Sequence, residues 1–206
     1  MHARDEGMEQ DKAEHVRATR KAAEEGNAQA QCDLGAMYEK GDGVVQDKAE
    51  AVQWYRKAVE QGNAQAQCNL GNMYYKGEGV TQDKAEAAKW YSKGAEQGDA
   101  QAQCNLGDMY YNGEGVVQDK AEAAKWYSQA AAKGNPVAQR SLGDMYASGG
   151  GVRKDPSVAL EWYARAAGTY LAEGKKGDAV ICYDRAKEID AQNPLTKALY
   201  GKLYSG

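Results

Sequence analysis

The chain has 206 residues, of which 42% are hydrophobic and 27% charged, a composition typical of a folded protein rather than a disordered one. Its formal net charge of −4 disfavours a nucleic-acid partner, which requires a basic surface. The sequence contains no run of about 18 apolar residues, so it predicts no insertion into a membrane.

Residues 1–25 are expected to form one helix that corresponds to half of a repeat found downstream. The segment Gln10–Gly26 aligns with Gln46–Gly62, but Ala18 and Thr19 stand where the later segment has Trp-Tyr. A half-repeat leaves one end of a repeat array open, so self-association through this end is a further expectation. The N-terminal residues are charged and include no apolar signal-peptide core. This favours a cytoplasmic location, with a periplasmic or secreted one left open.

Residues 26–168 contain four repeats of 36 residues, and this repetition is the organising feature of the sequence. We place the repeats at 26–61, 62–97, 98–133 and 134–168. Leu-Gly-x-Met-Tyr begins at Leu34, Leu70, Leu106 and Leu142, Gly-x-Gly-Val at Gly41, Gly77, Gly113 and Gly149, and Trp-Tyr at Trp54, Trp90, Trp126 and Trp162.

Each repeat predicts two helices joined by a short turn. The first helix ends at the glycine pair, because glycine adopts the left-handed conformation readily. In the first three repeats a Glu follows the second N-cap Asp by three residues, which predicts an Asp version of the capping box. The expected N-caps are Asn27, Asn63, Asp99 and Asn135 for the first helices, and Asp47, Asp83, Asp119 and Asp155 for the second helices.

The apolar pattern predicts how these helices pack. On the first helix Ala30, Leu34 and Met37 lie on one stripe, and on the second helix Ala51 and Tyr55 do the same. A single hairpin leaves part of this surface uncovered, so neighbouring hairpins are expected to stack into a solenoid.

Residues 169–206 break the repeat frame and are expected to form capping helices. One helix is predicted to begin near Asp178, and a last one to run from Asn193-Pro194 to about Tyr204. Irregular terminal helices that cover the core are typical of repeat arrays.

The repeat motif resembles the Sel-one-like repeat (SLR), a relative of the tetratricopeptide repeat that is frequent in bacteria. The resemblance rests on Ala-x-Ala-Gln-x-x-Leu-Gly-x-Met-Tyr-x-x-Gly-x-Gly-Val-x-x-Asp followed by Ala-x-x-Trp-Tyr-x-x-Ala, and it covers Gly26–Gly168. It implies a right-handed superhelix whose first helices line a concave face, and adaptor roles in protein assembly. The stretch Gly177–Pro194 looks more like the second helix of a tetratricopeptide unit.

Catalytic and ligand-binding alternatives are weaker than structural ones. The Gly-x-Gly turns lack the preceding strand and the following Gly-Lys-Ser/Thr of a phosphate-binding loop. His2 and His15 are the only histidines and lie outside the repeats, which disfavours a catalytic triad or a histidine metal site. The Trp-Tyr pairs fit core packing better than a ligand-stacking strip. We therefore predict no enzyme activity, no cofactor and no metal.

The four cysteines are predicted to be free thiols. Cys32, Cys68 and Cys104 recur once per repeat at one helical position, and Cys182 stands apart. Packed helices lie about 8–10 Å apart, beyond the roughly 7 Å between Cα atoms that a disulfide allows. Some secreted members of the family pair two cysteines within each repeat, and this chain departs from that pattern.

One stripe on the first helices varies between repeats and is the candidate binding surface; the alternative is a solvated face free to drift. Amide side chains can pair with a peptide backbone, and tyrosine offers rigid contact area. The predicted partner-binding residues are Gln65, Asn69, Asn72, Tyr75, Lys76, Gln101, Asn105, Asp108, Tyr111 and Asn112.

The sequence thus predicts an all-α fold, a right-handed α-solenoid superhelix of antiparallel helix hairpins with four 36-residue SLR repeats plus capping helices. The predicted function is a protein–protein interaction scaffold or adaptor that binds a peptide or partner protein on its concave face. The alternative is a non-catalytic regulatory or recruiting subunit of an enzyme complex.

Overall fold

A computed structural model describes residues 2–204, with side chains from residue 12 onward. Met1, the last two residues and the side chains of residues 2–11, including His2, lie outside that description. The described chain is built of α-helices, as predicted, and none of them is long and apolar enough to cross a membrane. The helices are α1 (His2–Glu24), α2 (Ala28–Lys40), α3 (Lys48–Glu60), α4 (Ala64–Lys76), α5 (Lys84–Glu96), α6 (Ala100–Asn112), α7 (Lys120–Ala132), α8 (Pro136–Ser148), α9 (Pro156–Ala172), α10 (Lys176–Asp190) and α11 (Pro194–Tyr204).

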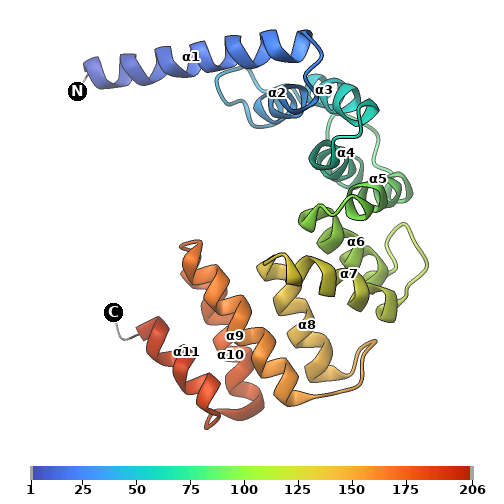
Figure 1. The fold of residues 1–206 in the computed structure, drawn as a ribbon, viewed down its shortest axis with the longest axis vertical. Helices are drawn as coiled ribbons and strands as arrows, with labels where there is room; N and C mark the ends of the chain where they lie inside the picture. The colour runs from blue at the N-terminus through green and yellow to red at the C-terminus, as the bar shows by residue number, and fades with distance from the viewer. Residues whose placement is uncertain (1, 205–206) are drawn as a thin grey trace. The chain divides into compact units, whose positions relative to one another are not determined.

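The chain divides into two compact units, an N-terminal unit of Met1–Ala102 and a C-terminal unit of Gln103–Gly206. In the N-terminal unit α2 packs against α3 and α4 against α5 as helix hairpins, while α1 packs on α2 and α3 on α4 (Figure 1). In the C-terminal unit α8 and α9 form a hairpin, and α7 packs on α8. The even-numbered helices α2 to α8 are the first helices of the four repeats.

The predicted N-caps hold the helix starts. Asn27 accepts a hydrogen bond from the backbone N of Ala30 at 2.9 Å, and Asp47 accepts one from the backbone N of Glu50 at 2.9 Å. The reciprocal half of the predicted capping box is absent in the described helices. The backbone N of Asp47 donates to the carbonyl of Tyr38 at 2.9 Å and so ties the second helix to the first. The capping-box prediction was therefore half wrong, because the hairpin itself uses that donor.

The Gly-x-Gly pairs are turns. Gly77 and Gly79 have φ values of 73° and 68°, in the left-handed region, and Gly77 ends α4 with its N–H on the carbonyl of Met73. A Cβ at Gly79 would collide with the backbone of Lys48 at the start of α3. The second glycine is thus required where one hairpin meets the preceding one.

A glycine on each first helix lets a tyrosine of the second helix enter the core. A Cβ at Gly71 would lie 2.6 Å from Cε1 of Tyr91, and Tyr91 is buried. The same pairing occurs between Gly35 and Tyr55, Gly107 and Tyr127, and Gly143 and Tyr163. This contact explains the Gly of Leu-Gly-x-Met-Tyr and the Tyr of Trp-Tyr together.

A buried glutamine also recurs on the first helices. Gln31 donates to the carbonyl of Ala23 at 3.0 Å and accepts from the side chain of Gln61 at 2.7 Å, so it links three successive helices of the N-terminal unit. Gln97 donates to Gln67 in the same way at 2.7 Å. A satisfied amide inside the core fixes the register of stacking, because an unsatisfied one would cost about 1–3 kcal/mol.

The α1 helix makes a contact that recurs on the second helix α3. Nη2 of Arg20 donates to the hydroxyl of Tyr38 at 2.9 Å, and one repeat later Nη2 of Arg56 donates to the hydroxyl of Tyr74 at 3.0 Å.

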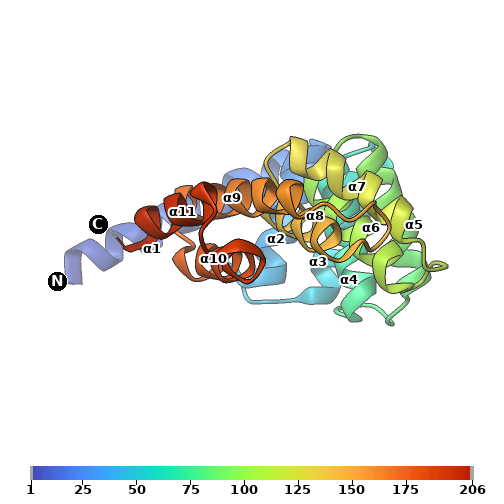
Figure 2. The same ribbon diagram turned by 90° about the horizontal axis from the view of Figure 1, so that it is seen from below.

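The C-terminal helices continue the array. The α9 helix runs past Gly168 to Ala172, and α10 and α11 both pack against it. In the view of Figure 2, α9 and α11 lie above α10. Two ion pairs join α8 to α10. Nη1 of Arg140 lies 3.9 Å from Oδ1 of Asp178, and Nη1 of Arg185 lies 3.8 Å from Oδ1 of Asp144. The α10 helix therefore lies beside both α8 and α9, and the likeness of Gly177–Pro194 to a second tetratricopeptide helix stays a prediction.

Candidate functional site

Part of the polar stripe on the first helices forms hydrogen bonds with tyrosines of the core. Each tyrosine described above donates its hydroxyl through the hairpin to an acceptor on the first helix. The donor–acceptor distances are 2.6 Å for Tyr55 to Glu39, 2.7 Å for Tyr91 to Asn72, 2.6 Å for Tyr127 to Asp108 and 2.7 Å for Tyr163 to Asp144. Asn72 and Asp108, predicted as ligand contacts, thus first satisfy a phenol that burial would otherwise leave unpaired.

The first repeat uses a different acceptor for the same purpose. Ala36 occupies the position of Asn72 and Asp108, and Glu39, three residues later, accepts the hydrogen bond of Tyr55 instead. In the next two repeats the position of Glu39 holds Tyr75 and Tyr111. Each first helix therefore carries one acceptor for its tyrosine, at one of two adjacent turns.

The remaining predicted residues of the N-terminal unit differ in how exposed they are. Gln65 and Lys76 are exposed at the two ends of α4, and Gln101 is exposed near the start of α6. Asn69 is half-buried, with Nδ2 3.7 Å from Sγ of Cys32. Tyr75 is half-buried beneath the ammonium of Lys84, which lies 5.1 Å from the ring centroid.

In the C-terminal unit Asp108, Tyr111 and Asn112 come together in a small hollow of 210 Å³. Its other lining residues are Tyr127 of α7 and Ser141 and Asp144 of α8. A second hollow of 430 Å³ shares Tyr111 and Asp144 with the first and is completed by Ala147, Ser148, Tyr163, Arg185, Glu188 and Ile189. The two form one groove, here called the α6–α8–α10 groove. Asn105, also on α6, is half-buried and does not line it.

Burial sets the electrostatics of this groove. Burial raises the pKa of the Asp108 carboxyl above its ordinary range, although the hydrogen bond from Tyr127 and the charge of Arg140 act in the opposite direction. Burial and the nearby Asp108 also raise the pKa of the Tyr127 hydroxyl, which stays a donor. The groove thus contains a carboxylate that is poorly solvated when charged.

Sequence reasoning missed the residues that α8 and α10 add to the groove. Ser141 and Asp144 belong to the variable stripe but lie in the fourth repeat, whereas the predicted binding residues lie in the second and third repeats. Arg185, Glu188 and Ile189 lie outside the repeat frame. The available signal was the helical pattern after Asp178, which predicts a helix next to the last repeat.

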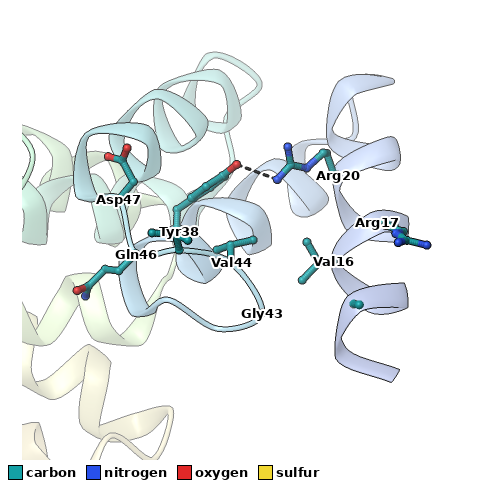
Figure 3. A pocket seen from close by; sticks show the side chains of 10 residues that line it. Val16, Arg17, Arg20, Tyr38, Gly43, Val44, Gln46 and Asp47 are labelled. Atoms are coloured by element: carbon teal, nitrogen blue, oxygen red, sulfur yellow. Dashed lines mark hydrogen bonds between the residues drawn. The ribbon is translucent and has the colours of Figure 1, made fainter. Parts of the chain in front are cut away.

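A third hollow, of 550 Å³, lies where α1 meets the turn between α2 and α3 (Figure 3). Val16 points toward Gly43 and Val44, and the hydrogen bond between Arg20 and Tyr38 closes one side. Because Arg56 and Tyr74 repeat this contact inside the array, the hollow reflects how a second helix packs on the next hairpin.

The cysteines and Trp54 are buried. All four cysteines are free and buried, and burial raises the pKa of Cys32 and Cys104 to about 12 and that of Cys182 to about 11. Trp54 is buried, with the ammonium of Lys57 3.8 Å from its ring centroid. Within the described residues, no group of three or more His, Cys, Asp or Glu side chains is placed to hold a metal ion.

Comparison with known proteins identifies the repeat. The family model of the Sel1 repeat matches residues 28–63, 64–99, 100–135 and 136–167, and each match begins at the first residue of a first helix. No curated protein matches the sequence.

Several solved structures resemble this chain. A protective antigen of uropathogenic Escherichia coli strains, which displays an SLR fold, is 38% identical with a TM-score of 0.78 over 91% of this chain; the chain spans 40% of that protein's length. A Sel1 repeat protein from Oxalobacter formigenes is 32% identical with a TM-score of 0.79, over 94% of this chain and 79% of its own. The immunity protein Pa5087 of Pseudomonas aeruginosa shares the fold at 22% identity and a TM-score of 0.56, over 86% of this chain and 74% of its own.

Proposed function

Because this chain belongs to the Sel1 repeat family, whose members are generally protein-interaction scaffolds, we propose that it holds an extended segment of a partner protein on its first helices. The observation that carries the proposal is the α6–α8–α10 groove, which crosses the first helices α6 and α8 and the following helix α10 of one compact unit. Family members are typically non-catalytic, and the proposed role is recruitment rather than chemistry.

Side-chain chemistry along the groove suits a peptide. Tyrosine and asparagine side chains supply contact area and adaptable hydrogen bonds, as they do in many protein-binding surfaces. Asn112 is exposed at the end of α6, and Tyr111 is half-buried with its ring held by Lys120, whose Nζ lies 5.0 Å from the centroid. Pre-positioned side chains of this kind reduce the entropy lost on binding.

A paired-variant pull-down tests the proposal. Tagged wild-type protein is compared with Tyr111→Ala, which alters the groove, and with Lys125→Ala, which removes an exposed side chain from the second helix α7. We expect Tyr111→Ala to reduce recovery of a specific partner from the source lysate at least about tenfold, while Lys125→Ala recovers it as wild type does. The reverse pattern, with both variants folded, would place the binding surface on the second helices and reject the proposal.

The same experiment separates the two kinds of scaffold. One enzyme recovered in fixed proportion indicates a recruiting subunit of an enzyme complex. Several unrelated proteins that share one short segment indicate an adaptor.

A further inference from the structure

We propose that the smaller hollow of the α6–α8–α10 groove takes the side chain of a lysine or arginine from the partner's extended segment. This inference rests on the proposed function and specifies the chemistry of its ligand. It is carried by the size of the hollow, by its charge, and by a comparison between repeats within the chain.

The size of the hollow fits one long side chain. Its 210 Å³ is below the roughly 300–1,000 Å³ of pockets that hold small molecules. It opens into the 430 Å³ hollow across Tyr111 and Asp144, which line both. A segment lying along the larger hollow can therefore insert a neighbouring side chain into the smaller one.

The charge of the hollow selects a cation. Asp108 and Asp144 both line the hollow, and none of the described residues that line it is basic. Each carboxylate accepts one hydrogen bond from a tyrosine hydroxyl, at 2.6 Å from Tyr127 and 2.7 Å from Tyr163. A carboxylate can accept several more, so both keep capacity for an ammonium or guanidinium donor.

One of the two carboxylates, Asp144, is in an ion pair with an arginine at the edge of the larger hollow. Nη1 of Arg185 lies 3.8 Å from Oδ1 of Asp144, on the side of the larger hollow, and about half of the Arg185 side chain is exposed. Arg140 lies 3.9 Å from Asp178 and acts on Asp108 through its charge. A cation that enters the hollow would stabilise the charged form of Asp108 and so oppose the effect of burial on its pKa.

The preceding repeat provides an internal comparison. Asn72 and Lys76 stand at the positions of Asp108 and Asn112, while Tyr75 matches Tyr111. The third repeat is thus more negative by one charge at each of two positions, although the tyrosine and the buried contact are kept. Because Asn72 accepts from Tyr91 at 2.7 Å, the buried hydrogen bond does not require an acid. We therefore assign the negative charge of Asp108 to binding a positively charged ligand.

The larger hollow suits an apolar residue beside the basic one. Ala147 and Ile189 supply apolar surface, while Arg185 and Glu188 offer a donor and an acceptor for the segment's backbone. The proposed ligand is an extended segment with a basic residue next to an apolar one.

Capped peptides test this inference without knowledge of the partner. The probes are acetyl-Gly-Lys-Leu-Gly-amide, the same peptide with norleucine or glutamate in place of lysine, and the matching arginine peptide. Binding is followed by backbone amide shifts of isotope-labelled protein. We expect the lysine and arginine peptides to shift the amides of Asp108, Asn112 and Asp144 saturably, with a dissociation constant of about 1 mM. The norleucine peptide, which has the same length but no charge, should bind at least about tenfold more weakly.

Variants separate this inference from the proposed function. Asp108→Asn installs the residue found at position 72 and should weaken the lysine peptide about tenfold, whereas Glu60→Gln, an equal change of charge at an exposed site on α3, should not. Norleucine binding as tightly as lysine, or no probe binding at about 10 mM, overturns the inference. If the pull-down partner still depends on Tyr111, the proposed function stands without it.

Discussion

Replacing Gly71 with alanine tests how the second-helix tyrosines enter the core. The new Cβ would lie 2.6 Å from Cε1 and 2.7 Å from Cδ1 of Tyr91, where carbon atoms normally approach to about 3.5–4.0 Å. The ring must then move by roughly 1 Å, which would stretch the 2.7 Å hydrogen bond from its hydroxyl to Asn72.

The expected loss of stability follows from three contributions. Overpacking typically destabilises by about 1–3 kcal/mol, and losing a buried hydrogen bond by about 1 kcal/mol. Alanine in place of glycine inside a helix offsets about 1 kcal/mol. We therefore expect Gly71→Ala to lower the free energy of unfolding by about 1–3 kcal/mol, measured by urea denaturation followed by circular dichroism.

Gly168→Ala is the matched control. Gly168 lies within α9, where a Cβ would meet no atom within 4 Å, so alanine should stabilise by up to about 1 kcal/mol. Equal stabilisation by both substitutions would refute the account of the glycine–tyrosine contact.

Three further outcomes are expected. Asp108→Asn should raise the melting temperature at neutral pH by a few degrees, since the folded-state pKa of Asp108 is raised. The wild-type acid therefore favours the folded state below its unfolded pKa of about 3.9, and this contribution is lost as pH rises through the raised folded-state pKa. The stability advantage of the variant should grow between these two pKa values, and an advantage that stays constant over this pH range would contradict the prediction. A thiol reagent at mildly alkaline pH should label the four buried cysteines slowly in the folded protein and all of them quickly in denaturant; fast labelling of the folded protein would contradict their burial. If the chain self-associates in light scattering, Tyr200→Glu with Tyr204→Glu should reduce it, because these half-exposed rings lie 4.9 Å apart on α11; persistence of the larger species would favour the α1 end, as the sequence predicts.

The sequence was sufficient to predict the repeated hairpins, because their determinants are local. Asn63 caps α4 and Gly77 ends it, and both are recognisable from residue type and spacing alone. The same reasoning placed α11 after Asn193, which accepts a hydrogen bond from the backbone N of Leu195 at 2.9 Å. Helix ends of this kind depend on a few neighbouring residues.

Local patterns did not predict which polar residues of the first helices bind a core tyrosine and which are exposed. Asn72 and Lys76 share one stripe, yet Asn72 satisfies Tyr91 across the hairpin and Lys76 is exposed. That distinction depends on the depth to which Tyr91 inserts beside Gly71, which is a property of the packed hairpin. One sequence signal was present, since Glu39 appears in the repeat that has Ala36.

The proposed function requires that the α6–α8–α10 groove contacts the partner. Photo-crosslinking detects this contact, with a benzophenone amino acid placed at Asn112 of α6 or at Lys125 of α7, both of which are exposed. We expect a discrete crosslinked partner from position 112 and none from position 125. A partner captured from position 125 but not from position 112 would contradict it.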